Sequence, residues 1–312
     1  MVGTWTRRAL AILPLLAAAA LSGCAAFESE RSGIVVTTNI LGDLTRNIVG
    51  DQAEVTVLMG ADADPHSFGV SAQQAASLEQ AELLIHNGLG LEEGVLGHVE
   101  AAVATGVPDL AVGEHVDPID YATDENTGES AGQPDPHFWT DPVRVSDAVD
   151  LIADTVIEQV PGVDAEQIRA NADAYRTQVD DLHEYASELF AGIPPEHRKL
   201  VTNHHVFGYL AQRYDFEIIG AVIPSGTTLA SPSGSDLKDL ADAVAASGVP
   251  VVFADSSQPD RLVQAMAEEA DVDIEVVPLF TESLTEPGEG AGTYLEMTRS
   301  NAEAIAAGLG AA

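Results

Sequence analysis

The feature that constrains the fold most is an alternation of strand patterns with helical patterns, which occurs in two series. The first series has a β-branched run at 34–38 and further strand patterns at 55–59, 83–85 and 107–112, with helical patterns at 40–50, 71–80 and 92–105. The second has strand patterns at 200–202, 217–223, 251–253 and 274–277, with helical patterns at 206–214, 236–247, 261–270 and 293–308. Such alternation predicts parallel βα units. We therefore expect an α/β fold with two (β/α) lobes of about four units each, although no convincing sequence repeat links them.

Between the two series lies the longest helical pattern, from Asp164 to Phe190. Apolar residues recur at steps of four and three from Ile168 to Leu189, and polar residues fill the opposite face. About 27 residues at ~1.5 Å each would span ~40 Å, which suits a long rigid helix joining two lobes. A two-helix hairpin or a coiled-coil arm is the alternative. Just before it, Asp141-Pro142 predicts a further helix start, because Asp favours the N-cap and Pro the first helical position.

The N-terminus has the pattern of an export signal. Arg7 and Arg8 precede an apolar run from Ala9 to Leu21, which ends in Leu-Ser-Gly-Cys. The run is too short to span a membrane. Its end resembles the lipobox of bacterial lipoproteins, in which the cysteine, here Cys24, is acylated and becomes the new N-terminus. An ordinary signal peptide with a chance cysteine is the alternative.

We expect the chain to be divided into five parts. They are a signal peptide over 1–23, a tether over 24–33, an N-terminal lobe over 34–160, a linker helix over 161–195 and a C-terminal lobe over 196–312.

Charge and cysteine content exclude several classes of function. The 50 acidic residues against 13 basic ones give a net charge of -37, so nucleic-acid binding, which needs a basic surface, is excluded. The same charge opposes electrostatic attachment to anionic lipid, and a covalent lipid would be needed to hold the protein at a membrane. Cys24 is the only cysteine, so a metal site in the body must use His, Asp and Glu.

Three histidines lie where parallel sheets commonly place binding residues, near the carboxyl ends of the predicted strands. His66 follows the second predicted strand, His137 precedes the helix that starts at Pro142, and His204, with His205 beside it, follows the strand at 200–202. Ligands bind at the carboxyl ends of the strands in open α/β sheets. Neutral imidazole suits zinc, and three such ligands leave a fourth position. The best acid to fill it is Glu282, which follows the last strand.

Each of these residues has a structural alternative. His66 and His137 both follow an Asp-Pro pair and could simply close turns. His204 could be a buried, hydrogen-bonded histidine, and Glu282 one more solvated acid. If Glu282 is not a ligand, water could hold the fourth position, as in a zinc hydrolase. The sequence has no HExxH motif, no recognisable serine-nucleophile motif and no glycine-rich phosphate loop.

Four segments in order carry a resemblance. They are Asp64-Pro65-His66-Ser67-Phe68, Asp135 to Pro142, His204 to Tyr209, and Glu282 to Gly288. The pattern resembles the solute-binding proteins of metal-uptake ABC transporters, the zinc and manganese cluster, from Ile34 to the last helix. The resemblance implies two lobes joined by a long helix and a metal buried in the inter-lobe cleft. By position, His66, His137 and His204 match the family's three histidines. Glu282 and His205 each stand where the family usually has Asp.

The resemblance also implies a cargo and partners. Manganese members typically have Glu at the third position, so His204 favours zinc, with manganese as the alternative. The acidic segment from Gly113 to Gln133, which we expect to be a mobile loop, departs from the histidine-rich loop of many zinc members. With four protein ligands the site would have no open position for a metal-bound water, so we expect the protein not to be an enzyme. We also expect a monomeric extracytoplasmic lipoprotein, anchored to the membrane through Cys24. Its partners would be the permease of an ABC importer and a metallochaperone, and host adhesion is a role sometimes attached to the family.

One expectation follows from charge alone. Three neutral imidazoles and one carboxylate offset only one of the two charges of a divalent ion. We therefore expect additional carboxylates behind the ligands, of which the sequence gives no identity.

Overall fold

The computed structural model describes residues 33–122, 130–248, 251–256, 261–269 and 274–310. The predicted signal peptide and Cys24 lie outside these residues. Among the helices in the described ranges, none is both long enough and apolar enough to cross a membrane.

The first sheet is parallel and has the strand order β2-β1-β3-β4. Its central strand β1 is entirely buried, and Val35 pairs with Thr56 on one side and Leu84 on the other. The strands are β1 (Ile34–Val36), β2 (Val55–Val57), β3 (Leu83–His86) and β4 (Asp109–Ala111), and the helices between them are α1 (Asn39–Val49), α2 (Ala72–Gln80) and α3 (Leu96–Ala104).

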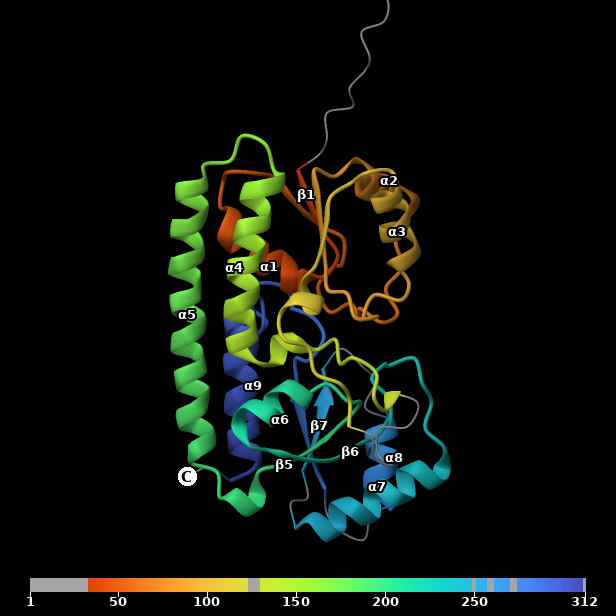
Figure 1. Ribbon diagram of the computed structural model, residues 1–312. Coiled ribbons are helices and arrows are strands. Elements are labelled where there is room, and N and C mark those ends of the chain that lie inside the picture. Colours follow the sequence, from red (N-terminus) through yellow and green to blue (C-terminus); the bar gives the residue numbers. More distant parts are fainter. Residues whose placement is uncertain (1–32, 123–129, 249–250, 257–260, 270–273, 311–312) are drawn as a thin grey trace, which may run out of the picture. The chain divides into compact units, whose positions relative to one another are not determined.

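The second sheet is also parallel, and its order, β6-β5-β7-β8, repeats that of the first. Its strands are β5 (Lys199–Thr202), β6 (Glu217–Ala221), β7 (Val251–Asp255) and β8 (Glu275–Leu279). The accompanying helices are α6 (Gly208–Tyr214), α7 (Gly234–Ser247), α8 (Arg261–Glu269) and α9 (Tyr294–Gly308). The predicted fold of two parallel α/β lobes with four strands each is confirmed, and the shared strand order appears without a shared sequence (Figure 1).

Most helix starts follow from local capping. Thr38 accepts from the amide of Leu41 at the start of α1, and Asp141 accepts from Val143 at the start of α4 (Pro142–Gln159). The largest difference from a predicted start is at α3, which begins at Leu96 and not at Glu92. The Glu92 carboxylate is buried and accepts hydrogen bonds from Thr37 Oγ1 and from the amide of Asn87, each at 2.7 Å. This tertiary contact keeps Glu92 in the loop.

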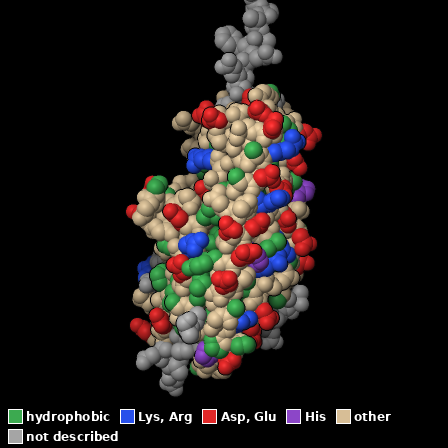
Figure 2. Space-filling view, turned by 90° about the vertical axis from the view of Figure 1, so that its left-hand side faces the viewer, with side chains coloured by type: hydrophobic (Ala, Val, Ile, Leu, Met, Phe, Trp, Pro, Cys, Tyr) green, Lys and Arg blue, Asp and Glu red, His purple; other side chains and the backbone are tan. Residues whose placement is uncertain are grey.

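The long pattern forms one unbroken helix, α5 (Ala165–Ala191), which runs beside α4 (Figure 1). Its first part, from Ile168 to Leu182, packs in the core that holds β1, β3 and α1, whereas Ala186 and Phe190 pack in the core of the second sheet. It therefore connects the two cores. The last residue that it buries is Phe190 and not the predicted Leu189. Figure 2 shows acidic side chains spread over this side of the molecule, and the exposed acids of α5 include Glu166, Asp173, Asp180, Asp181, Glu184 and Glu188.

Residues near the C-terminal end of the chain also link the two cores. Leu284, Tyr294 and Met297, which follow the last strand, are buried in the same cluster as Leu44 of α1 and Val149 of α4. The segment after β8 thus crosses from the second sheet to the first. This crossing holds the residues just after β8 next to the N-terminal lobe.

Candidate metal centre

Four buried side chains converge between the carboxyl ends of the two sheets. Their candidate ligand atoms all lie within 4.8 Å of one another, and none of the four residues is more than 2% exposed. They come from the loop after β2, the turn before α4, the loop after β5 and the loop after β8. They are His66, His137, His204 and Glu282. The structure therefore brings together all four residues named from the sequence.

The spacing of the ligand atoms suits a single ion. Nε2 of His137 lies 3.4 Å from Nε2 of His66 and 3.5 Å from Oε1 of Glu282. Nε2 of His204 is 2.9 Å from the same oxygen, and Nε2 of His66 is 3.8 Å from Oε2. A tetrahedral zinc with bonds of ~2.1 Å would separate its ligand atoms by ~3.4 Å. The observed separations scatter around that value.

Three of these polar atoms have no hydrogen-bond partner among the described residues. These three atoms are the two carboxylate oxygens of Glu282 and Nε2 of His204, and all three are buried. The short separation of Glu282 and His204 does not have the geometry of a hydrogen bond. A buried acceptor without a partner costs free energy, and a cation bound between these atoms would remove that cost. This fits the chemistry of the donor set, three imidazoles and one carboxylate.

The two Asp-Pro-His triplets form equivalent turns. In each, Oδ1 of the aspartate accepts the backbone amide of the histidine two residues later at 2.9 Å, from Asp64 to His66 and from Asp135 to His137. The two histidines thus close turns, as the structural alternative from the sequence proposed. Each turn also points the imidazole ring of its histidine into the site. The two interpretations of these histidines are compatible.

The Asp135 side chain has a second contact with His137 that the sequence analysis missed. Its Oδ1 also lies 2.8 Å from the ring nitrogen Nδ1 of His137. When Nε2 binds a metal, Nδ1 carries the ring proton and donates a hydrogen bond to this carboxylate. Asp135 is 1% exposed, and its contact with the ring of His137 makes it a carboxylate of the kind expected behind the ligands. The repeated triplet was the signal that could have identified it.

Neighbouring residues hold the Asp135 turn in place. The Tyr209 hydroxyl donates to the backbone oxygen of Asp135 at 2.6 Å, and the Asn87 amide donates to that of Pro136 at 3.0 Å. Gly208 is required by close approach, because a Cβ there would lie 2.5 Å from Oδ2 of Asp135. These contacts fix the position of His137 from both lobes.

The segment that carries Glu282 is fixed in a similar way. Thr281 donates its backbone amide to Asp255 at 3.2 Å, and its backbone oxygen accepts from the Trp139 indole at 2.9 Å. On the other side, the Asn39 amide donates to Ser283 Oγ at 2.7 Å, and its oxygen accepts from the amide of Leu284 at 3.0 Å. Residues of the N-terminal lobe therefore place Glu282 opposite the three histidines.

Burial governs the protonation of the site. Burial lowers the pKa of His66 well below its ordinary value, and the neighbouring His137 and His204 lower it further. Burial also lowers the pKa of His204, against the opposing effect of nearby carboxylates. For Glu282, burial raises the pKa to about 8, although His137 opposes the shift. Near neutral pH, His66 and His204 are therefore neutral and ready to bind a metal, whereas Glu282 holds a proton that a metal must displace.

The segment from Gly113 to Gln133 is structured where it is described. Tyr121 is only 8% exposed, exchanges backbone hydrogen bonds with Gln133 and Gly132, and places its hydroxyl 3.2 Å from Nδ1 of His137. These hydrogen bonds hold the predicted loop at Tyr121, Gly132 and Gln133, and its mobility stays a prediction. The acidic residues at 124, 125 and 129 lie outside the described residues. A polar segment without periodicity gave no signal for Tyr121.

The remaining histidines of the described chain lie outside the ligand group. His86 contacts Asp109 at 3.2 Å, and His183 contacts the Tyr214 hydroxyl at 3.0 Å. His205 donates its backbone amide to Ser225 and is not among the converging ligands. His115 ends a short 3₁₀ turn at Val112–His115. The structural interpretation of these residues is supported.

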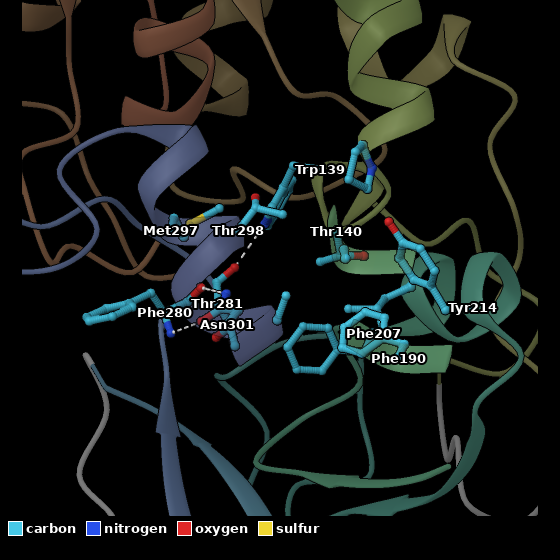
Figure 3. A pocket seen from close by; sticks show the side chains of 14 residues that line it. Trp139, Thr140, Phe190, Phe207, Tyr214, Phe280, Thr281, Met297, Thr298 and Asn301 are labelled. Atoms are coloured by element: carbon cyan, nitrogen blue, oxygen red, sulfur yellow. Dashed lines mark hydrogen bonds between the residues drawn. The ribbon is translucent and has the colours of Figure 1, made fainter. Parts of the chain in front are cut away.

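A separate pocket, lined mainly by aromatic and aliphatic side chains, lies between α5, α6 and α9 (Figure 3). Phe190, Phe207 and Tyr214 line one part of it, and Phe280 lines another. It borders the candidate metal site through the hydrogen-bonded pair Trp139 and Thr281, of which Thr281 precedes Glu282, and through Thr140, which donates to the backbone oxygen of His137 at 3.0 Å. None of the four converging residues lines it, so it contributes packing beside the site.

Comparisons with known proteins agree with this geometry. The profile of the ZnuA family, described as zinc-uptake complex component A periplasmic, matches residues 34–308. The zinc-binding protein TroA of Treponema pallidum (strain Nichols) is 30% identical over 280 residues, which cover 88% of each chain. The manganese-binding lipoprotein MntA of Halalkalibacterium halodurans is 29% identical over 282 residues and 90% of each chain. The manganese ABC transporter substrate-binding lipoprotein PsaA of Streptococcus anginosus is 29% identical over 304 residues, 94% of this chain and 96% of its own.

Solved structures show the same fold. The periplasmic zinc-binding protein TroA from Treponema pallidum superposes with a TM-score of 0.79 at 28% identity, over 89% of this chain and 99% of its own. The manganese-bound periplasmic metal-binding protein from Candidatus Liberibacter asiaticus has a TM-score of 0.76 at 24% identity, with the same coverage, and supports the fold alone. Since the family profile spans both sheets, α5 and all four converging residues, the chain belongs to the ZnuA family of zinc-uptake complex component A periplasmic proteins.

Proposed function

We propose that this protein captures zinc outside the cytoplasm and delivers it to the permease of an ABC importer. The observation that carries the proposal is the convergence of His66, His137, His204 and Glu282, with ligand atoms within 4.8 Å and almost no exposure. A site buried to this degree holds an ion away from solvent, which suits a carrier. The names of the relatives, which include ABC transporter substrate-binding lipoproteins, support the same role.

The donor set favours zinc over manganese. Three imidazoles match the preference of zinc, whereas manganese prefers carboxylate and other oxygen ligands. The charges also balance, because Glu282 and the Asp135 carboxylate behind His137 together offset a divalent cation. Manganese remains the alternative cargo, since relatives of similar identity are named for zinc and for manganese.

We further propose that the protein is not an enzyme. Four protein ligands fill a tetrahedral zinc and leave no position for a reactive water. A hydrolase would need Glu282 outside the metal's coordination shell. Glu282→Ala separates the two functions: a carrier should bind zinc less tightly without this carboxylate, whereas a hydrolase should keep its affinity.

The division of the chain and its location belong to the same proposal. A signal peptide over 1–23 would be removed, Cys24 would be acylated, and a tether over 24–33 would lead to the lobes at 34–160 and 196–312, joined by the linker at 161–195. Relatives described as lipoproteins support this arrangement. Cys24→Ala should release the protein from the membrane fraction, and mass spectrometry of the wild-type N-terminal peptide should find a lipid on Cys24. A membrane-bound Cys24→Ala protein would contradict the anchor.

The decisive experiment is a competitive titration of the metal-stripped mature protein with zinc and manganese. We expect one tightly bound zinc per chain and loss of that binding in His204→Ala. His98→Ala is the matched control, because His98 is exposed on α3, away from the site. Preference for manganese would overturn the choice of cargo. If neither ion binds, the proposed function is wrong.

A further inference from the structure

The loop between β6 and α7 is held by side chains of the N-terminal lobe. The hydroxyl of Thr228 donates to Oδ2 of Asp64 at 2.6 Å. The hydroxyl of Tyr121 lies 3.4 Å from the backbone oxygen of Gly226, to which it donates. The backbone amide of Gly226 also donates to Ser130 Oγ at 2.8 Å. Gly226 and Thr228 of the β6–α7 loop are thus hydrogen-bonded to residues of the N-terminal lobe.

Two of these three hydrogen bonds involve side chains that contact the candidate ligands. Asp64, which receives the Thr228 hydroxyl, accepts the backbone amide of His66 through its other oxygen. Tyr121, which reaches Gly226, also lies 3.2 Å from Nδ1 of His137. The β6–α7 loop therefore contacts the supports of two histidines without belonging to the ligand set.

These hydrogen bonds differ from the other contacts that hold the site. Near Glu282, the Trp139 indole and the Asn39 amide bond to backbone groups of Thr281 and Leu284, in a segment whose following residues share the core around α1 and α4. The β6–α7 loop is more exposed: Thr228 is half-buried, and Leu229 beside it is 53% exposed. Regions with few buried contacts open at lower free energy. The loop is therefore the part of the enclosure that can separate with least disruption of the cores.

We propose that Thr228 and Tyr121 act as a clasp on the β6–α7 loop and set the rate at which the bound metal leaves. Thr228 holds the turn of His66 through Asp64, and Tyr121 lies between His137 and the same loop. They are positioning residues, since neither is a metal ligand. Release then begins with the breaking of the two hydroxyl contacts, after which the β6–α7 loop is free to move away from the His66 and His137 turns and open the site. This inference rests on the proposed function, because it needs a metal cargo.

The test is the rate of zinc transfer from the loaded mature protein to an excess of chelator. Thr228→Val removes the hydroxyl but keeps the shape, and Tyr121→Phe does the same for the phenol. Each should raise the dissociation rate about 2- to 10-fold, as expected for the loss of one hydrogen bond. Thr228→Ser, which keeps the donor, should restore the wild-type rate. Thr227→Val is the matched control, because the Thr227 side chain contacts only its own loop at Leu229 among the described hydrogen bonds.

A second test changes Gly226, the partner of Tyr121 in this contact. A methyl group added at Gly226 would clash with the phenol ring of Tyr121. Gly226→Ala should therefore accelerate zinc release in the wild-type background and have no further effect in a Tyr121→Ala background.

The outcomes distinguish the clasp from the proposed function. If zinc binds at one per chain but leaves Thr228→Val and Tyr121→Phe at the wild-type rate, the clasp is wrong and the carrier stands. If Thr227→Val accelerates release as much as Thr228→Val, the effect is not specific to the Asp64 contact, and the clasp is again wrong. If the wild-type protein binds neither zinc nor manganese, both proposals fail together.

Discussion

Asp135 and His137 contact each other twice within one turn. One carboxylate oxygen of Asp135 accepts the backbone amide of His137 at 2.9 Å and lies 2.8 Å from Nδ1 of the same residue. This double contact fixes both the position and the tautomer of the ring, and it turns Nε2 toward the other ligands. The corresponding Asp64 accepts the backbone amide of His66 with one oxygen and the hydroxyls of Ser67 and Thr228 with the other.

Removal of the Asp135 charge should weaken metal binding. Asp135→Asn keeps an acceptor of similar shape but leaves the site with one negative charge less. We expect zinc affinity to fall about 10- to 100-fold, as is typical when a partner of a metal-bound histidine is changed. Competition with a chromogenic chelator measures the change.

Asp109→Asn is the matched control for that variant, because Asp109 pairs with His86 outside the site at 3.2 Å. It should leave zinc affinity at the wild-type value. Equal affinities for wild type and Asp135→Asn would show that this carboxylate does not support the metal.

The elements of the fold were predictable because their signals are local. The β-branched run around Val35 and the Asp141-Pro142 cap specify a strand and a helix start without reference to distant residues. The histidines were predictable for a related reason. A residue just past a parallel strand, such as His204 after β5, lies at the edge of the sheet whatever the details of packing.

The contacts that hold the site were not predictable, since they depend on the docking of distant segments. Tyr121 lies in a polar stretch without periodicity, and its burial arises from contact with His137 and Gly226. Glu92 has the preference of a helical residue, yet its contact with Thr37, 55 positions away, keeps it in a loop. The sequence determines such pairs only through the completed fold.

Metal binding should release a proton from Glu282. Because burial raises the pKa of this carboxyl to about 8, the metal-free site holds a proton at pH 7 that the metal must displace. The lowered pKa of His66 and of His204 leaves those rings neutral, so they contribute no proton. We expect release of about one proton per zinc at pH 7, falling toward zero above about pH 9.

Calorimetry in buffers that differ in ionisation enthalpy measures this number. A site built from histidines of ordinary pKa would instead release more protons as the pH falls through 6. An increase of that kind, or no release at pH 7, would contradict the raised pKa of Glu282. Glu282→Gln, where it still binds zinc, should release none at pH 7.

The same carboxyl should make the metal-free protein less stable as the pH rises. Between pH 4.5, the ordinary value, and about 8, the unfolded chain has lost this proton and the folded chain retains it. The unfolded state therefore binds fewer protons in this window, and the free energy of unfolding falls with rising pH, by up to about 1.4 kcal/mol per pH unit. Above pH 8 the loss from this group is complete.

Glu282→Gln removes that titration. Urea unfolding of metal-stripped protein should show the variant gaining stability over wild type from pH 5 to 8, with a constant difference at higher pH. Added zinc should reverse the order, because the wild type regains a ligand that the variant lacks. A difference that does not change with pH would mean that Glu282 has an ordinary pKa in the folded protein.

The buried ion pair at the start of α4 should contribute to stability far more than a surface pair. Asp141 is fully buried, and its Oδ2 lies 2.6 Å from Arg144 and 2.8 Å from Arg213 of α6. Asp141→Asn retains a good N-cap residue, so the variant isolates the loss of charge. Arg144, only 6% exposed, would then lose its close carboxylate partner. We expect the free energy of unfolding to fall by about 3–5 kcal/mol, the usual cost of breaking a buried pair.

Asp150→Asn provides the comparison, because it breaks an ion pair of the same length, 2.6 Å to Arg176, between side chains that are 49% and 41% exposed. That change should cost about 0–1 kcal/mol. Urea denaturation of both variants, metal-free and at low salt, gives the two values. Since Arg213 belongs to α6 and Asp141 to the start of α4, a large difference would show that this pair stabilises the contact between the two lobes. Equal costs would mean that Arg144 finds sufficient compensation from its contacts with Asp117 and Gln212 at 3.3 and 3.2 Å, and that the buried carboxylate is not needed to hold α4 against α6.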